Sequence, residues 1–253
     1  MKSYIIGIAG KKNSGKDTVA SMINYIFAKG ITAATYRDWL LYKESYDATY
    51  KHRITHFADA LKDCLSVIYH IPRQYFDDRE YKDNMYYNLR TGEFIHKDKI
   101  PQREYYYFVI NNDDIKHSSI REQIETYDEL FPLITLHTLM QYFGTNLCRE
   151  YLQSDIWIKA TMAKASDICL ANRLCIIPDV LFTNEATAIQ TKESFLYGGV
   201  IMVRRDNNGS DDDIDYHSSE IVTFSTDYSI TNNGTLMDLF YKVVEICQKI
   251  ILQ

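Results

Sequence analysis

A glycine-rich segment near the start of the chain constrains the fold more than any other feature. Residues 10–16 read Gly-Lys-Lys-Asn-Ser-Gly-Lys, which meets the pattern G-x-x-x-x-G-K. An apolar run at residues 4–9 precedes it and predicts a buried strand, and residues 18–27 after it predict a helix. Between a strand and a helix, this pattern is typical of a loop that binds phosphate groups.

Each part of this segment has a physical reason to bind a nucleotide. Glycine lets backbone N–H groups close around phosphate oxygens, and the N-terminus of the following helix adds partial positive charge. Lys16 can then reach the β- and γ-phosphates. The predicted nucleotide-binding residues of the loop are Gly10, Lys12, Asn13, Ser14, Gly15, Lys16, Asp17 and Thr18.

The residue after Lys16 departs from the general pattern. A Ser or Thr hydroxyl usually stands there and binds Mg²⁺, but this chain has Asp17, followed by Thr18. Asp17 could bind Mg²⁺ directly or through water, or it could only favour the helix N-terminus through the helix dipole. We expect Thr18 to contact the α-phosphate and include it with Asp17 among the candidate metal ligands.

Composition argues against several classes of protein. No apolar run is long enough to cross a membrane, and a formal net charge of −6 argues against a broad nucleic-acid-binding surface. The five cysteines include no C-x-x-C pair, so we expect buried thiols in a reducing cytosol rather than disulfides or a zinc site. We therefore expect a cytoplasmic protein with small-molecule ligands, no membrane partner and no direct binding of nucleic acid.

Apolar periodicity predicts alternating strands and helices along the rest of the chain. Further strands are expected at residues 52–57, 174–177, 199–203 and 227–230, with a hairpin at 86–95. Helices are expected at 59–69 with Asp59 as N-cap, across 136–147, after Asp155 with Ala160 and Ala163 facing inward, from 184, and at 235–251. Residues 36–50 carry no decisive pattern, and 96–130 are expected to be irregular. The alternation predicts an α/β fold with a mostly parallel central sheet, helices on both faces and the glycine-rich loop at its carboxyl edge.

Short motifs follow the glycine-rich loop in a characteristic order. They are His56-Phe57-Ala58-Asp59-Ala60-Leu61-Lys62, Asp78-Arg79-Glu80-x-Lys82, Gln141-x-x-Gly144-Thr145, Pro178-Asp179, Asn184-Glu185-Ala186, Gly198-Gly199, Asp215-x-His217-x-x-Glu220 and Ile230-Thr231-Asn232-Asn233-Gly234-Thr235. With the Gly-Lys-Asp-Thr form of the loop, this series resembles the deoxynucleoside monophosphate kinases of bacteriophages. The resemblance covers nearly the whole chain except residues 36–50 and 86–130.

The resemblance implies a three-layer P-loop kinase-like fold, with residues 1–253 as a single domain. Its core would be about 1–35, 52–70 and 132–253, with an inserted acceptor-side region at about 71–131 and a lid at about 204–220. It also implies transfer of the γ-phosphoryl group of ATP, with Mg²⁺, to deoxynucleoside 5′-monophosphates for viral DNA synthesis. A homodimer is one possibility that the resemblance raises.

The resemblance gives roles to four candidate catalytic residues. Lys16 would hold the donor phosphates, and Arg79 the acceptor phosphate, unless Arg79 and Lys82 only form a solvated helix face. Asp179 would hold Mg²⁺ or its water at a strand end, where an aspartate could also simply shape a turn. Arg205 would begin a flap that closes over ATP.

Candidate substrate-binding residues follow from the same motifs. Gln141 would bond a base edge beside Gly144, although Gly144 could instead mark a kink or an end of the helix. Trp157 could stack on a base or fill the core, and Glu185 could orient a cation or be an ordinary acid of a first helical turn. Asn233 would border the adenine of ATP or form a plain turn. The full substrate-binding set is Asp59, Lys62, Arg79, Lys82, Gln141, Gly144, Thr145, Arg149, Trp157 and Glu185.

Three positions depart from the family pattern. Many members carry arginine where this chain has His137 and Leu181, and an acid where it has Asn146. Missing cations near a phosphoryl-transfer site need replacements, for which the sequence offers Arg103, Arg121 and Arg149 without choosing among them. Two other functions stay open: a P-loop kinase of another small acceptor, of the dephospho-coenzyme A or phosphomevalonate type, and a nucleotide-binding protein without turnover.

Overall fold

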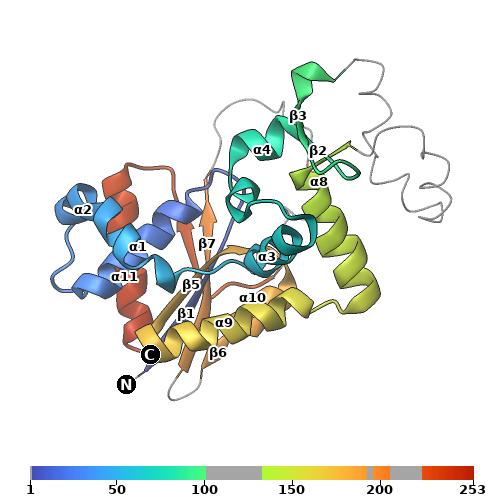
Figure 1. Ribbon diagram of the computed structural model, residues 1–253. Coiled ribbons are helices and arrows are strands. Elements are labelled where there is room, and N and C mark those ends of the chain that lie inside the picture. The colour runs from blue at the N-terminus through green and yellow to red at the C-terminus, as the bar shows by residue number, and fades with distance from the viewer. Residues whose placement is uncertain (1, 101–132, 193–195, 206–223) are drawn as a thin grey trace. The chain divides into compact units, whose positions relative to one another are not determined.

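The computed structural model describes residues 2–100, 133–192, 196–205 and 224–253 (Figure 1). The chain divides into two compact units. The first comprises Met1–Asp59 and Trp157–Gln253, and the second Ala60–Ile156. The predicted insertion at residues 71–131 falls inside the second unit, which also includes flanking stretches that the sequence pattern places in the core.

The first unit is built on a five-stranded sheet. Four of its strands run parallel, in the order β5 (Leu174–Val180), β1 (Ser3–Ala9), β7 (Leu196–Arg204) and β8 (Tyr228–Thr231). The short β6 (Thr191–Lys192) pairs antiparallel with the beginning of β7. β1 and β5 are buried along most of their length, as expected of parallel strands that are covered on both faces. Because the strands are parallel, the segments that follow them meet at one carboxyl edge.

One face of this sheet is covered by three helices, α1 (Lys16–Lys29), α2 (Tyr36–Thr49) and α11 (Leu236–Ile251). They enclose a core that includes Ile23, Trp39 and Phe240. Thr35 begins α2 by accepting the N–H of Asp38 at 3.2 Å, and Trp39 is the one buried residue of that helix. A helix with so little buried surface leaves a weak apolar pattern, which explains why residues 36–50 were not predictable.

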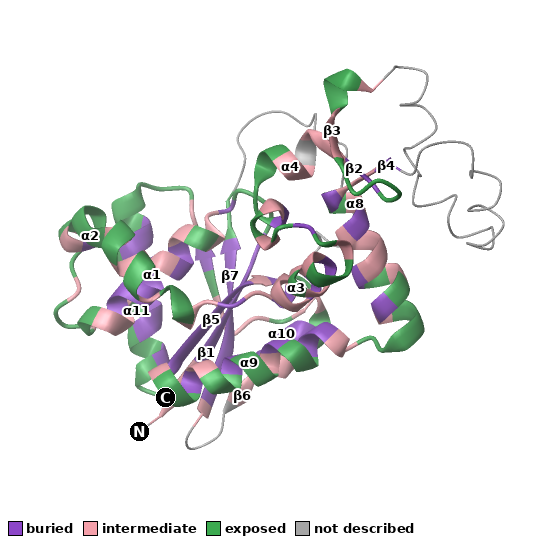
Figure 2. Cartoon of the chain, viewed as in Figure 1, coloured by how far each residue is buried: buried purple, intermediate pink, exposed green. Residues whose placement is uncertain are grey.

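The other face is covered by α9 (Ile156–Asn172) and α10 (Thr183–Ile189). They pack with buried strand residues such as Ile177 and Val200. Figure 2 shows the strands of this sheet as mostly buried. Helix, sheet and helix thus form three layers. This arrangement confirms the predicted α/β fold of the P-loop kinase type, with a mostly parallel sheet.

The second unit contains a three-stranded antiparallel sheet and several helices. The strand order is β3 (Phe94–His96), β2 (Met85–Asn88) and β4 (Leu133–Thr135). The helices are most of α3 (Phe57–Tyr69), α4 (Arg79–Asp83), α8 (Leu136–Gln141), the π-helix η4 (Tyr142–Leu152) and the 3₁₀ turns η2 (Arg73–Phe76) and η3 (Lys97–Lys99). The pairing of β2 with β3 confirms the predicted hairpin.

Several predicted boundaries were wrong. Residues 52–57 form no strand: Lys51–Arg53 is a 3₁₀ turn, η1, and Ile54 makes a single bridge to Ile176 at the sheet edge. Helix α3 begins at Phe57, so Asp59 lies within its first turn and is not the N-cap. Both errors have one cause, because Phe57 was assigned to the end of a short strand, whereas it is the first residue of the helix.

The inward face of α9 also differs from the prediction. Ala160 and Ala163 are exposed, whereas Trp157, Thr161 and Ala165 are buried. Alanine is small enough to fit on either the buried or the exposed side of a helix. These two residues therefore did not show which side of α9 faces the core. The strands β5 and β7 are longer than predicted, because β5 continues through Pro178 at a register shift and β7 begins at Leu196. Among the described residues, no helix is long and apolar enough to cross a membrane.

Candidate active site

The glycine-rich loop forms a cradle between β1 and α1. Lys16 turns back over it and donates from Nζ to the carbonyl oxygens of Gly10 at 2.6 Å and Lys11 at 2.8 Å. Gly10 has a positive φ of 149°, and a Cβ there would lie 2.3 Å from the carbonyl oxygen of Val203. Only glycine fits at that position, which keeps the loop narrow enough to surround a phosphate group.

Two features of the loop fit an anionic ligand. The hydroxyl of Ser14 is buried and has no hydrogen-bond partner among the described residues. Gly15 occupies the N-cap position of α1 without a side-chain cap, so the first N–H groups of that helix have no side-chain acceptor at its start. A phosphate group supplies the acceptors that these donors need.

Asn232, just after β8, supports the loop although β7 lies between β8 and β1. Its Nδ2 donates to the carbonyl oxygen of Ser14 at 2.9 Å, and its backbone N–H donates to the carbonyl oxygen of Arg204 at 2.7 Å. A Cβ on Gly15 would lie 2.6 Å from that Nδ2. Sequence patterns pointed to the adjacent Asn233, which is exposed. The triplet Asn-Asn-Gly indicates a turn, but it does not show which of the two asparagines faces the loop.

Asp17 and Thr18 lie in the first turn of α1, where Asp17 is exposed and Thr18 is half-buried. This position allows both of the proposed roles of Asp17, as a metal ligand and as a partner of the helix dipole. No group of three or more His, Cys, Asp or Glu side chains suited to a metal occurs in the described part of the chain. Mg²⁺ bound with a nucleotide needs only one or two protein ligands, because phosphate oxygens and water supply the others.

Asp179 lies near the end of β5 and contacts the start of α3. Its Oδ1 accepts the N–H of Phe57 at 3.0 Å, and its Oδ2 accepts the N–H of Ala58 at 3.3 Å. Burial raises the pKa of Asp179 and outweighs the opposing effects of His56 and of these two N–H groups. Its two hydrogen bonds show that the carboxylate holds the start of a helix and does not shape a turn of its own.

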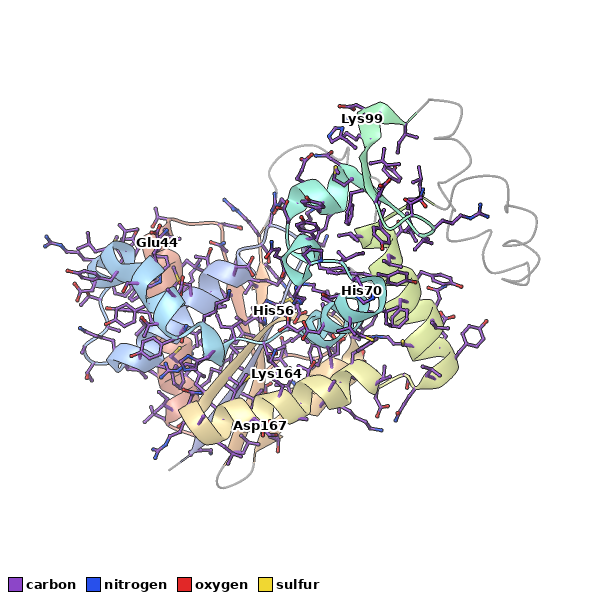
Figure 3. The ribbon with its side chains drawn as sticks, in the orientation of Figure 1. Glu44, His56, His70, Lys99, Lys164 and Asp167 are labelled. Carbon is purple, nitrogen blue, oxygen red and sulfur yellow. The ribbon has the colours of Figure 1, made fainter. Side chains whose placement is uncertain are left out.

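Asp59 lies close to His56 and Lys164 and forms an ion pair with Lys164. Figure 3 labels these two partners. Its Oδ2 accepts the N–H of His56 at 3.0 Å and lies 3.3 Å from Lys164 Nζ. Burial alone would raise the pKa of Asp59, but the hydrogen bonds from His56 and the charges of His56 and Lys164 lower it on balance. Lys164 comes from the middle of α9, and no local sequence signal identifies it as a partner of Asp59.

Glu185 and Trp157 are both buried in the first unit. Glu185 is 1% exposed, and its Oε2 accepts the N–H groups of Leu181 at 2.9 Å and Phe182 at 3.1 Å. These bonds cap α10, which is the simpler of the two roles considered for this acid. Trp157 is 7% exposed in the first turn of α9, and this burial favours the core-filling role.

Arg205 is exposed directly after β7, at the carboxyl edge of the sheet. The rest of the predicted lid, residues 206–220 with His217, lies outside the described residues. Arg103 and Arg121, two of the possible replacement cations, lie outside them as well. The roles expected for these residues remain predictions.

In the second unit, Lys62 of α3 is held by an acidic partner. Its Nζ donates to Asp77 Oδ1 at 2.8 Å, and Arg73 binds the other oxygen of Asp77. Arg79 is exposed at the first position of α4, and Lys82 is half-buried on the same helix. The three predicted acceptor-side cations are thus all in this unit, and Lys62 has a defined ion pair.

The helices α8 and η4 carry the remaining predicted substrate-binding residues. Gln141 ends α8, and the π-helix η4 that follows carries Gly144, Thr145 and Arg149. Gly144 is not a helix end: a Cβ there would lie 2.7 Å from Cδ2 of Leu61 on α3, so glycine permits a close approach of two helices. Departures from α-helix to π-helix are frequent at functional sites.

Comparison with known proteins agrees with this geometry. A model of the family described as deoxynucleotide monophosphate kinase matches residues 4–243. A protein of Acanthamoeba polyphaga mimivirus, named "Putative deoxynucleotide monophosphate kinase", is 28% identical over 154 residues, which cover 54% of this chain and 72% of the viral protein. The family match extends over both units and includes the glycine-rich loop. The chain therefore belongs to the deoxynucleotide monophosphate kinase family.

Proposed function

We propose that this protein transfers the γ-phosphoryl group of ATP, in the presence of Mg²⁺, to a deoxynucleoside 5′-monophosphate. Family membership supports the acceptor class, and the glycine-rich loop supports the donor. The observation that carries the proposal is the Lys16 ammonium, which rests on the carbonyl oxygens of Gly10 and Lys11. A small rotation of the Lys16 side chain would let its ammonium group leave a carbonyl oxygen and bind a phosphate oxygen instead.

On the donor side, the chain's own groups would bind phosphate and exclude water. The N–H groups at the start of α1 and the Ser14 hydroxyl would donate hydrogen bonds to oxygens of the triphosphate, and Lys16 would neutralise its terminal groups. Arg205, after β7, would add a second cation, and Asn233 would border the base. Such fixed donors and cations stabilise negative charge that spreads over the transferred group.

Asp17 and Thr18 are the proposed Mg²⁺ ligands, and Asp179 would act on a water molecule of the ion. This division fits Asp179, because each of its oxygens already accepts a backbone N–H. The ion would supply further charge neutralisation at the transferred group.

On the acceptor side, the second unit offers cations for a monophosphate. Arg79 and Lys82 would bind the acceptor phosphate together with Lys62, whose pairing with Asp77 orients its side chain. Gln141, Gly144, Thr145 and Arg149 would contact the nucleoside. The attacking phosphate oxygen is largely deprotonated at neutral pH, since the second pKa of a phosphate monoester is about 6. The side chains therefore need to position and neutralise charge, and no general base is required.

The direct test measures ADP formation from ATP and Mg²⁺ with each deoxynucleoside monophosphate and its ribonucleotide counterpart. Lys16→Ala should abolish turnover, whereas Lys29→Ala, which removes the same charge from the last turn of the same helix, should keep it. Turnover with at least one deoxynucleotide supports the proposal and gives its specificity. ATP binding without turnover on any of these acceptors would point to another acceptor or to a nucleotide-binding protein without catalysis.

A further inference from the structure

Two aspartates hold the N-terminus of α3. Asp179 accepts the N–H groups of Phe57 and Ala58, one on each oxygen, and Asp59 accepts the N–H of His56. The N–H of Asp59 itself donates to the carbonyl oxygen of His56 at 3.1 Å. All four N–H groups at this helix start therefore have an acceptor, and two of them depend on a residue from β5.

We propose that Asp179 is a positioning residue that fixes the start of α3 to β5 and thereby orients the acceptor-binding part of that helix. This inference rests on the proposed function and adds to the role of Asp179 toward Mg²⁺. The two bonds join segments that are 122 and 121 residues apart in the chain. Lys62 follows three residues after Asp59 on α3, so the first turn sets the direction of its side chain.

The carboxylate is suited to this task for two reasons. It offers an acceptor to each N–H at once, and its negative charge is favourable at the positive end of a helix. An asparagine would keep one acceptor but turn an NH₂ group toward the second N–H. Phe57 is 4% exposed in the core of the first unit, so burial of its ring and the bond to its N–H hold the same residue.

Nearby charges allow the two carboxylates to coexist. The negative charge of Asp59 disfavours ionisation of Asp179, and His56 acts in the opposite direction on both groups. Lys164 adds a positive charge 3.3 Å from Asp59. The negative charges of the two aspartates at the helix start are thus offset by His56 and Lys164, and Asp179 links the helix to the sheet.

The test compares Asp179→Asn with a matched control, Asp227→Asn. Asp227 also accepts a backbone N–H, that of Val200 at 2.9 Å, together with the side-chain amide of Gln190 at 3.0 Å, and it lies just before β8. Backbone amide exchange, thermal unfolding and the KM values for ATP and the deoxynucleotide are measured in both variants. Asp179→Ser, which keeps an oxygen acceptor without an opposing NH₂ group, replaces Asp179→Asn if that variant does not fold.

The expected result is faster exchange at Phe57 and Ala58 and a KM for the deoxynucleotide that rises about five- to tenfold, more than the KM for ATP. The kcat should fall as well, because the variant also removes the carboxylate that would act on the water of Mg²⁺. Asp227→Asn should lower the unfolding temperature without either change. Unchanged exchange at both amides, or a rise in KM no larger than in Asp227→Asn, would overturn the inference. A shift confined to the Mg²⁺ concentration for half-maximal activity would also overturn it, because Asp179 would then act on the metal alone.

The exchange measurement separates this inference from the proposed function. If the wild-type protein transfers phosphate to no deoxynucleotide, the proposed function fails, but exchange at Phe57 and Ala58 still reports whether Asp179 anchors α3. If the wild-type protein is active and exchange does not change, only the anchoring role fails.

Discussion

The side-chain amide of Asn232 donates to the carbonyl oxygen of Ser14 at 2.9 Å, across a separation of 218 residues. The segment after the last strand therefore supports the loop after the first one. Since β7 lies between β1 and β8, this bond reaches over the carboxyl end of β7. The backbone N–H of Asn232 bonds Arg204, the last residue of β7, so the brace is itself fixed.

Loss of this hydrogen bond should weaken ATP binding more than it slows the phosphoryl-transfer step. We expect Asn232→Ala to raise the KM for ATP about five- to tenfold, because one hydrogen bond to a loop carbonyl is worth about 1 kcal/mol. The kcat should change less, since Lys16 remains. Steady-state kinetics at saturating deoxynucleotide measure both values. Asn233→Ala is the comparison: a larger effect there than at Asn232 would favour the contact predicted from sequence.

Because Asn232 lies so close, a methyl group added at Gly15 should disturb the loop. Gly15→Ala places a Cβ 2.6 Å from Asn232 Nδ2 and forces alanine into a φ of 100°. Gly30→Ala has a similar φ of 88° but meets nothing within 4 Å, so it isolates the cost of backbone strain. We expect both variants to lose about 1–3 kcal/mol of unfolding free energy and only Gly15→Ala to lose ATP affinity. Equal ATP affinity in the two variants would show that the collision is harmless.

The sequence predicted the loop and the four parallel strands of the first unit because their signals are local. An apolar run, a glycine-rich loop and a helix stand next to each other at residues 4–27, and each has its own pattern. The partners of Asp59 and Asp179 were not predictable in this way. Lys164 and Asp179 reach the start of α3 from distant segments, and no residue near them signals that contact. The sequence identified both carboxylates, but apart from the N–H of His56, which is local to Asp59, only the fold shows which groups donate to them.

Gly144 shows a second limit of local patterns. From sequence alone, a glycine in a helical stretch indicates close contact with a ligand, or a kink or an end of the helix. The structure gives a different reason, which is the side chain of Leu61 on another helix. Such contacts depend on how two helices meet, and periodicity within one helix carries no information about it.

Gly144→Ala should therefore act through packing. The added methyl group would lie 2.7 Å from Leu61 Cδ2, and we expect a loss of about 1–3 kcal/mol of unfolding free energy. Leu61→Ala should remove the collision, so the double variant should be more stable than the sum of the two single changes predicts. Urea unfolding of the four proteins measures this coupling. Strict additivity would mean that Leu61 rotates away without cost.

The ion pairs of Asp77 should make the stability of the protein depend on pH. Burial would raise the pKa of Asp77, but hydrogen bonds and charges from Lys62 and Arg73 lower it on balance. A pKa lowered in the folded state contributes stability above the unfolded value, about 3.9, and that stability is lost as the pH falls through the folded pKa. The Asp77 side chain is 56% exposed, so solvent screening keeps the contribution below about 1 kcal/mol. Asp77→Asn should lower the unfolding free energy at pH 7 and approach the wild type below about pH 4. Urea unfolding at several pH values tests this, with Glu44→Gln on the exposed side of α2 as the control, and a difference that persists at low pH would assign the effect to packing.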